Sequence, residues 1–315
     1  MGRDESLVSI ADRLRDSRVL FSEPMANHTS FRIGGPCDLL VLPDTVEDAI
    51  LAWTMCRDLS VPCRIVGNGT NLLVRDGGIR GCLVKMAPGF TGIERNGSAT
   101  LFAKSGTLLP RLVQVALEHE LSGLEFAVGI PGSVGGAVSM NAGAYGGDFG
   151  SLVRKVQAAS LDGGIRWFDR DELDFSYRHS LFQARGDLLV LGVELGLVKG
   201  DRKSIHDLMQ FRARERERKQ PLDVPSAGSA FRRPPGHYVG SMIESLGMKG
   251  FRHGGAEVSQ RHAGFIVNAG NATAKDVLTL MSVIQEKVKD AYGVDLEPEV
   301  MVIGEDAPDS YGQKM

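Results

Sequence analysis

A dense run of glycine between residues 129 and 147 constrains the fold of this chain more than any other feature. Seven of these 19 residues are glycine, and the run separates two otherwise apolar stretches. Glycine loses more conformational freedom on folding than any other residue, so such density weakens regular structure. The run therefore indicates a loop whose backbone a large ligand approaches closely. The ligand that we expect there is a diphosphate-bearing cofactor. The alternative is a structural loop packed against a helix.

A second, shorter glycine loop follows a predicted strand at residues 64–66. Its residues are Gly67, Asn68, Gly69, Thr70 and Asn71, followed by Leu72. Such glycines let successive backbone N–H groups turn toward one centre, which is how a loop holds phosphate without a basic side chain. Neither loop matches GxxxxGK[ST] or GxGxxG, so a P-loop ATPase or a Rossmann dehydrogenase is disfavoured. Either loop alone could be an ordinary turn, but two together favour a cofactor site.

The secondary-structure signals are mixed. Apolar spacing predicts helices at 44–59, 237–248 and 273–291. Helices are also expected at 107–118, with Pro110 in the first turn, and at 204–219, where the residues are mostly charged. Asp44 is the expected N-cap of the first helix. The Asn96–Gly97 pair predicts a hairpin, and a further strand is expected at 264–267. We therefore expect an α+β fold with a domain boundary close to residue 200.

Composition bears on the partners. The 315-residue chain has a net charge of −3 and an isoelectric point near 6.2, so no global positive field draws it to nucleic acid or an anionic membrane. The N-terminus lacks the apolar region of a secretory signal, and no apolar run reaches the ~18 residues of a spanning helix. We expect a cytoplasmic protein with no nucleic-acid, membrane or obligate protein partner.

The cysteines show no pattern typical of metal binding. Cys37, Cys56, Cys63 and Cys82 include no CxxC pair, and no histidine lies nearby at zinc-ligand spacing. We therefore expect no metal site and interpret these residues as reduced, mostly buried thiols.

Several unrelated motifs, found together and in order, resemble the UDP-N-acetylenolpyruvoylglucosamine reductase family. They are residues 31–35, 67–73, 129–145, 177–178 and 226–229, and the resemblance spans residues 28–303. It implies a two-part FAD-binding fold of the vanillyl-alcohol oxidase type, followed by a separate α+β substrate-binding domain. The corresponding ranges are an N-terminal helical segment at 1–30, the FAD-binding domain at 31–198, the substrate-binding domain at 199–304 and a flexible tail at 305–315. The chain resembles the shorter type of the family, which lacks a tyrosine-bearing insertion.

The resemblance also implies the reaction and its cofactors. Hydride passes from NADPH through noncovalently held FAD to the enolpyruvyl group of a UDP-sugar, which converts UDP-N-acetylglucosamine enolpyruvate to UDP-N-acetylmuramate. This step belongs to peptidoglycan synthesis, and so to cell-wall biogenesis and cell division. The implied flavin contacts are Gly67, Asn68, Gly69, Thr70, Asn71, Leu72, Gly129, Ile130, Pro131, Gly132, Ser133, Gly135, Gly136, Asn141, Ala142, Gly143 and Ala144.

Three residues match the family's catalytic positions. Ser229 matches the proton donor, although its own motif indicates only a turn with a capping serine. Arg178 matches an active-site arginine whose planar guanidinium suits a carboxylate gaining enolate charge. Glu299 matches the catalytic glutamate, and Glu297 is a rival carboxylate that the sequence alone does not separate from it.

Substrate contacts are implied at Tyr177, Arg214, Lys219, Arg232 and His262. Two of these lie in the basic run at 212–219, which is interleaved with glutamates and otherwise indicates a solvated helix face. The sugar or phosphate contact near Arg232 is open, because relatives often carry other residues there. A structural role for His262 is as plausible as a pocket role.

Two other functions fit parts of the pattern. One is an oxygen-using flavin oxidase of the same superfamily, and the other is a noncatalytic protein that binds UDP-sugars. The joint presence of Ser229, Arg178 and Glu299 favours the reductase over the binding protein.

Overall fold

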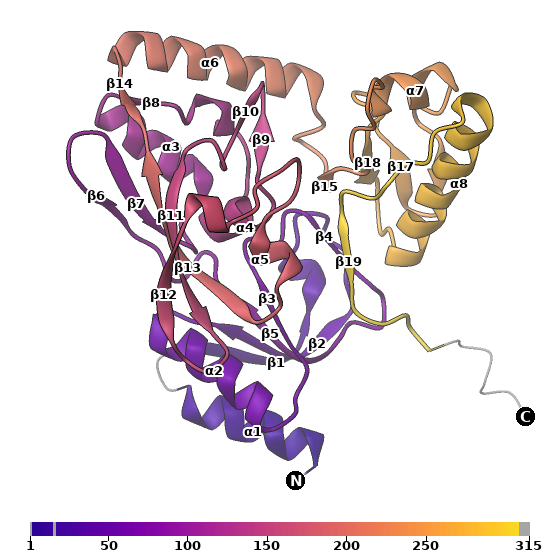
Figure 1. The fold of residues 1–315 in the computed structure, drawn as a ribbon. Helices are drawn as coiled ribbons and strands as arrows, with labels where there is room; N and C mark the ends of the chain where they lie inside the picture. The colour runs from indigo at the N-terminus through magenta and orange to yellow at the C-terminus, as the bar shows by residue number, and fades with distance from the viewer. Residues whose placement is uncertain (1, 15–16, 309–315) are drawn as a thin grey trace, which may run out of the picture. The chain divides into compact units, whose positions relative to one another are not determined.

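The computed structural model describes residues 2–14 and 17–308 and divides into two compact units (Figure 1). Unit 1 holds the described residues within Met1–Phe21, Leu39–Asn68 and Gly81–Arg216, and unit 2 those within Ser22–Asp38, Gly69–Arg80 and Glu217–Met315. The chain passes from one unit to the other inside strands β1 (Arg18–Pro24), β2 (Pro36–Leu42) and β5 (Ile79–Lys85) and inside helix α6 (Arg202–Lys219). The fifth crossing falls between Asn68 and Gly69, within the shorter glycine loop.

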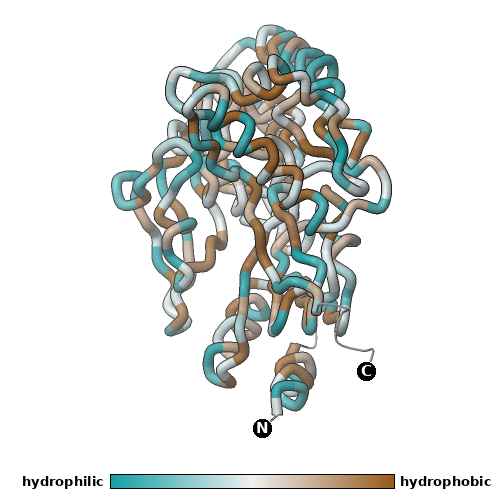
Figure 2. The backbone as a smooth tube through the Cα atoms, turned by 90° about the vertical axis from the view of Figure 1, so that its right-hand side faces the viewer, coloured by the Kyte–Doolittle hydropathy of each residue, from teal (hydrophilic) through white to brown (hydrophobic). Residues whose placement is uncertain are grey.

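The first sheet has the strand order β1-β2-β5-β3, with β3 at Cys63–Val66. Strands β3 and β5 are parallel, and Cys63 lies opposite Cys82. Helices α1 (Arg3–Arg13) and α2 (Val46–Asp58) pack in one hydrophobic core with this sheet. Figure 2 shows hydrophobic residues on one part of α1, beside the N mark, and hydrophilic residues on the rest; Leu7 and Ile10 are buried. An amphipathic helix of this kind covers a core with its apolar side.

Two details at the N-terminus differ from the sequence predictions. Residues 1–30 are not uniformly helical, because strand β1 and a 3-10 turn at Met25–Asn27 follow α1. The N-cap of α2 is Thr45 and not Asp44: the Thr45 hydroxyl accepts a hydrogen bond from the Asp48 N–H at 3.1 Å. Thr45 has the extended backbone that an N-cap requires, and the helix therefore begins one residue later than Asp44 would allow.

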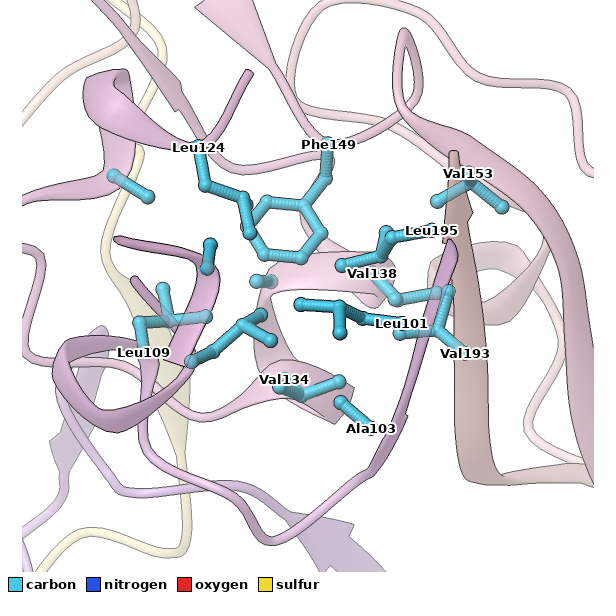
Figure 3. Close-up of a cluster of buried hydrophobic side chains, with 14 of the residues drawn as sticks. Leu101, Ala103, Leu109, Leu124, Val134, Val138, Phe149, Val153, Val193 and Leu195 are labelled. Atoms are coloured by element: carbon cyan, nitrogen blue, oxygen red, sulfur yellow. The ribbon is translucent and has the colours of Figure 1, made fainter. Parts of the chain in front are cut away.

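The second sheet of unit 1 is antiparallel, in the order β12-β11-β13-β7-β6. The strands are β6 (Ile93–Arg95), β7 (Thr100–Lys104), β11 (Val153–Ser160), β12 (Ile165–Asp169) and β13 (Leu188–Gly196). The predicted Asn96–Gly97 hairpin is confirmed as the β6–β7 turn, with Gly97 at φ +90°. Helices α3 (Leu109–Glu118) and α4 (Val134–Ser139) supply side chains to the same core. Figure 3 shows Leu101 and Val193 of the sheet together with Leu109 and Val138 of these helices in one buried cluster.

Short elements complete unit 1. They are β8 (Leu121–Ser122), a 3-10 turn at Glu125–Ala127, β9 (Gly143–Ala144), β10 (Gly147–Asp148), a 3-10 turn at Arg170–Glu172, α5 (Leu181–Ala184) and β14 (Val198–Lys199).

Unit 2 has a four-stranded sheet in the order β15-β18-β17-β16. Its strands and helices are β15 (Ser226–Ser229), α7 (Val239–Ser245), β16 (Arg252–His253), β17 (Ala256–Val258), β18 (Phe265–Asn268) and α8 (Ala274–Tyr292). Strand β4 (Leu72–Val74) pairs in parallel with β19 (Met301–Ile303). The buried face of α8, which includes Leu280 and Ile284, packs in the core of this unit.

The start of α8 is fixed by two side chains. Thr273 accepts from the Asp276 N–H in a capping box, and Asp76 accepts from the N–H groups of Ala274 and Lys275 at 2.7 and 3.0 Å. These bonds satisfy N–H groups that have no partner inside the helix. The predicted helices at 107–118, 204–219 and 273–291 are confirmed within a few residues. Helix α7 is shorter than the predicted 237–248, because Gly247 inside that range has φ +68°, a left-handed conformation that ends a helix.

Among the described residues, no helix is long and apolar enough to cross a membrane. The predicted tail at 305–315 lies outside the described residues from 309 onward.

Candidate active site

The two glycine loops meet in unit 1. The Asn68 side-chain amide donates a 2.7 Å hydrogen bond to the carbonyl oxygen of Pro131. A Cβ on Gly67 would collide with Ser133 Oγ, so only glycine fits there. Ser133 also caps α4 by accepting from the Gly136 N–H at 3.4 Å. Two loops far apart in the sequence therefore form one surface of backbone and small side chains.

The glycines of the longer loop occur for two different reasons, namely packing within the protein at some positions and open space beside the backbone at others. Gly129 has φ +73°, and a Cβ there would lie 2.8 Å from the Arg216 side chain, while a Cβ on Gly135 would lie 2.9 Å from that of Ser105. Packing within the protein thus explains these two. A Cβ on Gly136 would make only an ordinary contact at 3.4 Å, and one on Gly146 would meet no protein atom within 4 Å. The bare backbone at Gly136 leaves room for a ligand, so the loop fits a flavin diphosphate.

The second half of the shorter loop belongs to unit 2. Asn71 donates from its side-chain amide to the Glu299 carbonyl oxygen at 3.0 Å, and the Met301 N–H donates to the Asn71 carbonyl at 2.9 Å. Ser30 links this loop to another motif, since its N–H donates to the Gly69 carbonyl at 3.1 Å and its hydroxyl to the Ser226 carbonyl at 2.7 Å. Residues 69–71, Ser226 and Glu299 are thereby held in one network.

Ser229 and Glu299 lie on adjacent backbone segments of unit 2. The Glu299 N–H donates to the Ala230 carbonyl at 2.9 Å, and Ser229 precedes Ala230 at the end of β15. Ser229 lies opposite Phe265 in the sheet, with a register shift between Ser226 and Ser229 and Gly228 at φ +83°. The irregularity is the kind that re-aims a side chain at the end of a strand. Ser229 and Glu299 are both half-buried.

The rival carboxylate, Glu297, has different surroundings. Its side chain is 74 % exposed and faces Arg232, with 3.7 Å between Arg232 Nη1 and Glu297 Oε2. The two backbones are also joined, because the Arg232 N–H donates to the Glu297 carbonyl at 2.8 Å. An exposed carboxylate beside a cation is the weaker candidate for acid–base chemistry, so the geometry favours Glu299.

Arg178 occupies a tight turn in unit 1. Ser176 and His179 exchange backbone hydrogen bonds of 3.2 Å, which leaves Tyr177 and Arg178 at the tip, with Arg178 at φ +54°. The Arg178 guanidinium lies 5.1 Å from the Tyr177 ring centroid, and its Nη2 donates to the Gly143 carbonyl at 3.3 Å. The turn is therefore in contact with the longer glycine loop.

Asn141 supports this turn. Its side-chain amide donates to the Ser176 carbonyl at 2.8 Å, and its side-chain oxygen accepts from the Gly150 N–H at 2.8 Å. The residue is buried and has φ +42°, a conformation that asparagine tolerates better than most residues. Both the amide nitrogen and the oxygen of the Asn141 side chain are thus engaged in holding the turn.

His262 has a well-defined structural role. Its Nδ1 accepts from the Gly264 N–H at 3.0 Å, and its ring packs edge-on against Phe265 with 5.0 Å between centroids. Burial is the largest influence and lowers the pKa of His262, so the ring is neutral at physiological pH. Cβ atoms on Gly240 or Gly264 would lie 3.0 Å from this ring.

The residues of the basic run in α6 differ in their exposure to solvent. Arg214 and Lys219 are exposed, whereas Arg216 is 9 % exposed and lies against Gly129. Arg212 and Arg216 lie 5.6 and 5.8 Å from the Tyr145 ring centroid, and the Tyr145 hydroxyl donates to the Arg212 carbonyl at 3.2 Å. Burial lowers the pKa of the Arg216 guanidinium. Arg216 was not among the predicted site residues, because its position beside the glycine loop depends on tertiary packing.

Comparisons with known proteins agree with these features. Residues 37–169 match the FAD binding domain family, and residues 220–303 match the family described as UDP-N-acetylenolpyruvoylglucosamine reductase, C-terminal domain. The UDP-N-acetylenolpyruvoylglucosamine reductase of Syntrophomonas wolfei is 48% identical over 297 residues, which cover 94% of this chain and 99% of the relative. That of Alkaliphilus oremlandii is 45% identical over 288 residues, covering 91% and 94%.

A solved structure shows the same likeness. The crystal structure of the enzyme of this name from Thermus caldophilus superposes with a TM-score of 0.77 at 36% identity and covers 91% of this chain and 98% of its own. The predicted α+β class, with a two-part FAD-binding fold of the vanillyl-alcohol oxidase type followed by a separate α+β domain, is confirmed. The chain belongs to the UDP-N-acetylenolpyruvoylglucosamine reductase family and is an FAD-containing oxidoreductase.

Proposed function

We propose that this protein uses NADPH to reduce UDP-N-acetylglucosamine enolpyruvate to UDP-N-acetylmuramate, a cytoplasmic step in peptidoglycan precursor synthesis. The proposal is supported by the family membership. The relatives are named UDP-N-acetylenolpyruvoylglucosamine reductase, and the match covers almost their whole length. The observation that carries the proposal is the backbone bond from Glu299 to Ala230, because it holds two candidate proton-transferring residues on neighbouring segments.

The proposed cofactor is noncovalently bound FAD, and the chemistry that it supplies when bound is hydride transfer. Residues proposed to hold it are Gly67, Asn68, Gly69, Thr70, Asn71, Leu72, Gly129, Ile130, Pro131, Gly132, Ser133, Gly135, Gly136, Asn141, Ala142, Gly143 and Ala144. Support comes from the bonded pair Asn68–Pro131 and from the open backbone face of Gly136. The domain ranges proposed for these functions are 31–198 for FAD and 199–304 for the substrate.

Ser229 is the proposed proton donor. Reduction of the enolpyruvyl group leaves the second vinyl carbon carbanionic, conjugated with the substrate carboxylate, and that carbon takes the hydroxyl proton of Ser229. A serine hydroxyl is a weak acid, so the step requires a strongly basic carbon and a site from which water is excluded. The half-buried position of Ser229 at an irregular strand end is consistent with this requirement.

Arg178 and Glu299 are proposed to act on the substrate carboxylate. Arg178 would bind it and stabilise the charge that it gains, since a planar guanidinium forms paired hydrogen bonds with a carboxylate. Glu299 would polarise the same carboxylate or share a proton with it. What favours Glu299 over Glu297 is burial together with the exposed ion pair that engages Glu297.

The remaining proposed substrate contacts are Tyr177, Arg214, Lys219, Arg232 and His262. Arg214 and Lys219 are exposed, as a contact with a charged UDP group requires. For His262, any substrate contact falls to Nε2, because Nδ1 already accepts from Gly264.

An absorption spectrum of the purified protein tests the proposal. The expected result is a flavin spectrum that NADPH bleaches without oxygen and that the enolpyruvyl UDP-sugar restores, while UDP-N-acetylglucosamine without the enolpyruvyl group does not. Bleaching of the flavin by small alcohols and its restoration by oxygen, with no response to NADPH, would instead identify an oxidase. A folded protein that binds no FAD would reject the proposal.

A further inference from the structure

Three cysteines from three different elements converge in unit 1. Cys56 is near the end of α2, Cys63 is in β3 and Cys82 is in β5. Cys63 and Cys82 are direct neighbours in the parallel β3–β5 pair, and the three sulfur atoms all lie within 4.8 Å of one another. Of all described residues, only these three form a group of His, Cys, Asp or Glu ligands this compact.

The spacing of the sulfur atoms suits one bound ion. A metal–sulfur bond of about 2.3 Å puts the sulfurs of a three-coordinate site about 4 Å apart. Small side-chain rotations therefore suffice to bring all three onto a common centre. The backbone is already ordered for this, because the Val61 N–H donates to the Cys56 carbonyl and the Cys82 N–H to the Pro62 carbonyl, both at 2.8 Å.

The surroundings of the cluster exclude water but leave one side reachable. Cys56 and Cys82 are 0% and 1% exposed and share a core with Trp53 and Val84, whereas Cys63 is half-buried.

We propose that Cys56, Cys63 and Cys82 form a trigonal binding site for Cu(I). Soft thiolates select soft ions, and a site of three sulfurs in a dry core matches the low coordination number of Cu(I). Structural zinc takes four ligands, and the group offers three. Binding is not a redox step: the ion enters as Cu(I) and stays Cu(I), and the thiols that coordinate it release their protons to water.

A bound ion would link α2 to both strands. Because the site exists only in the folded chain, binding stabilises the fold by an amount that grows with the logarithm of the free Cu(I) concentration, and the unfolding temperature rises accordingly. The proposed copper site depends on neither flavin binding nor reductase activity, so it can be tested independently of the proposed function.

The test is an anaerobic titration of the reduced, FAD-loaded full chain with Cu(I) held by bicinchoninate. The expected result is removal of one equivalent of Cu(I) from the chelator and a raised unfolding temperature. Even outer-shell changes cost metal sites roughly 10–100-fold in affinity, so Cys63→Ser, which deletes a ligand, is expected to weaken binding about 100-fold or more. Cys37→Ser is the matched control, because Cys37 is a buried cysteine outside the group, and it should bind as the unmodified chain does.

Flavin absorbance and circular dichroism establish that each variant is folded. If Cys63→Ser does not fold, X-ray absorption of the copper-loaded unmodified protein decides, with three sulfur ligands expected. No removal of Cu(I) from the chelator, equal affinity in Cys63→Ser and Cys37→Ser, or coordination by nitrogen and oxygen would overturn the proposal.

Discussion

The backbone N–H of Glu299 donates a 2.9 Å hydrogen bond to the carbonyl oxygen of Ala230, the residue that follows Ser229. Asn71 adds a second tie by donating to the Glu299 carbonyl at 3.0 Å. The position of Glu299 thus depends on backbone bonds on both sides of the residue. The chain around Glu299 is thereby fixed in position.

The two carboxylates near this bond should differ sharply when each is neutralised. Glu299→Gln is expected to lower kcat by about 10²–10⁴-fold, the range for a group engaged in proton transfer. Glu297→Gln loses only an exposed pairing with Arg232, so kcat should change by no more than about 2-fold. Steady-state kinetics of both variants provide the check. Equal, modest effects would leave Glu299 without a catalytic role.

The open backbone face at Gly136 gives a prediction about cofactor binding. Gly136→Ala adds a methyl group that the protein itself accommodates, so the unfolding free energy of the apoprotein should stay within about 1 kcal/mol. FAD affinity should fall at least tenfold, measured by fluorescence titration of apoprotein, because the methyl group occupies the proposed flavin surface. Gly186→Ala is the control, since a Cβ there meets nothing within 4 Å and Gly186 lies outside both glycine loops. Unchanged FAD affinity in Gly136→Ala would place the flavin elsewhere.

Asn141 should be a stability determinant of the turn that carries Arg178. Asn141→Ala leaves the Ser176 carbonyl and the Gly150 N–H without their partner, and we expect a loss of about 2 kcal/mol in urea unfolding. Asn141→Asp keeps the acceptor for Gly150 and should fall between Asn141→Ala and the unmodified protein. A loss below about 0.5 kcal/mol in Asn141→Ala would show that these bonds contribute little.

The lowered pKa of Asp276 predicts that the stability of unit 2 depends on pH. Burial acts to raise the pKa of Asp276, but hydrogen bonds from the N–H groups of Thr273 and Gly255 and from the Thr273 hydroxyl outweigh it, and the net pKa is lowered from 3.8. A lowered folded-state pKa stabilises the fold above the unfolded value, and this contribution is lost as pH falls from 3.8 toward the folded value. Thermal unfolding of Asp276→Asn and the unmodified protein should therefore differ at pH 5–7 and converge below pH 3.8. A difference that persists unchanged to pH 3 would contradict this.

Local signals in the sequence predicted local structure well. The Asn96–Gly97 hairpin and the helix that begins after Thr273 depend on neighbouring residues, and both are confirmed. The N-cap of α2 was assigned one residue too early, because Asp44 and Thr45 are both good caps and the backbone decides between them.

Long-range packing was outside the reach of the sequence. Gly129 is glycine because Arg216 packs on it, and the cysteine group joins residues of α2, β3 and β5 with no recognisable spacing. Likewise, Glu299 and Glu297 became distinguishable only through their exposure and their partners. These features arise from contacts between distant segments, which a pattern along the chain does not record.

The most direct test of the central claim separates the two half-reactions in Ser229→Ala by anaerobic stopped-flow absorbance. Reduction of the flavin by NADPH should proceed at the rate of the unmodified enzyme, while reoxidation by the enolpyruvyl UDP-sugar should slow by about 10²–10⁴-fold because the proton donor is gone. Ser226→Ala, in the same strand, is the control and should keep both rates. Reoxidation of Ser229→Ala at a near-normal rate would remove Ser229 from its proposed role.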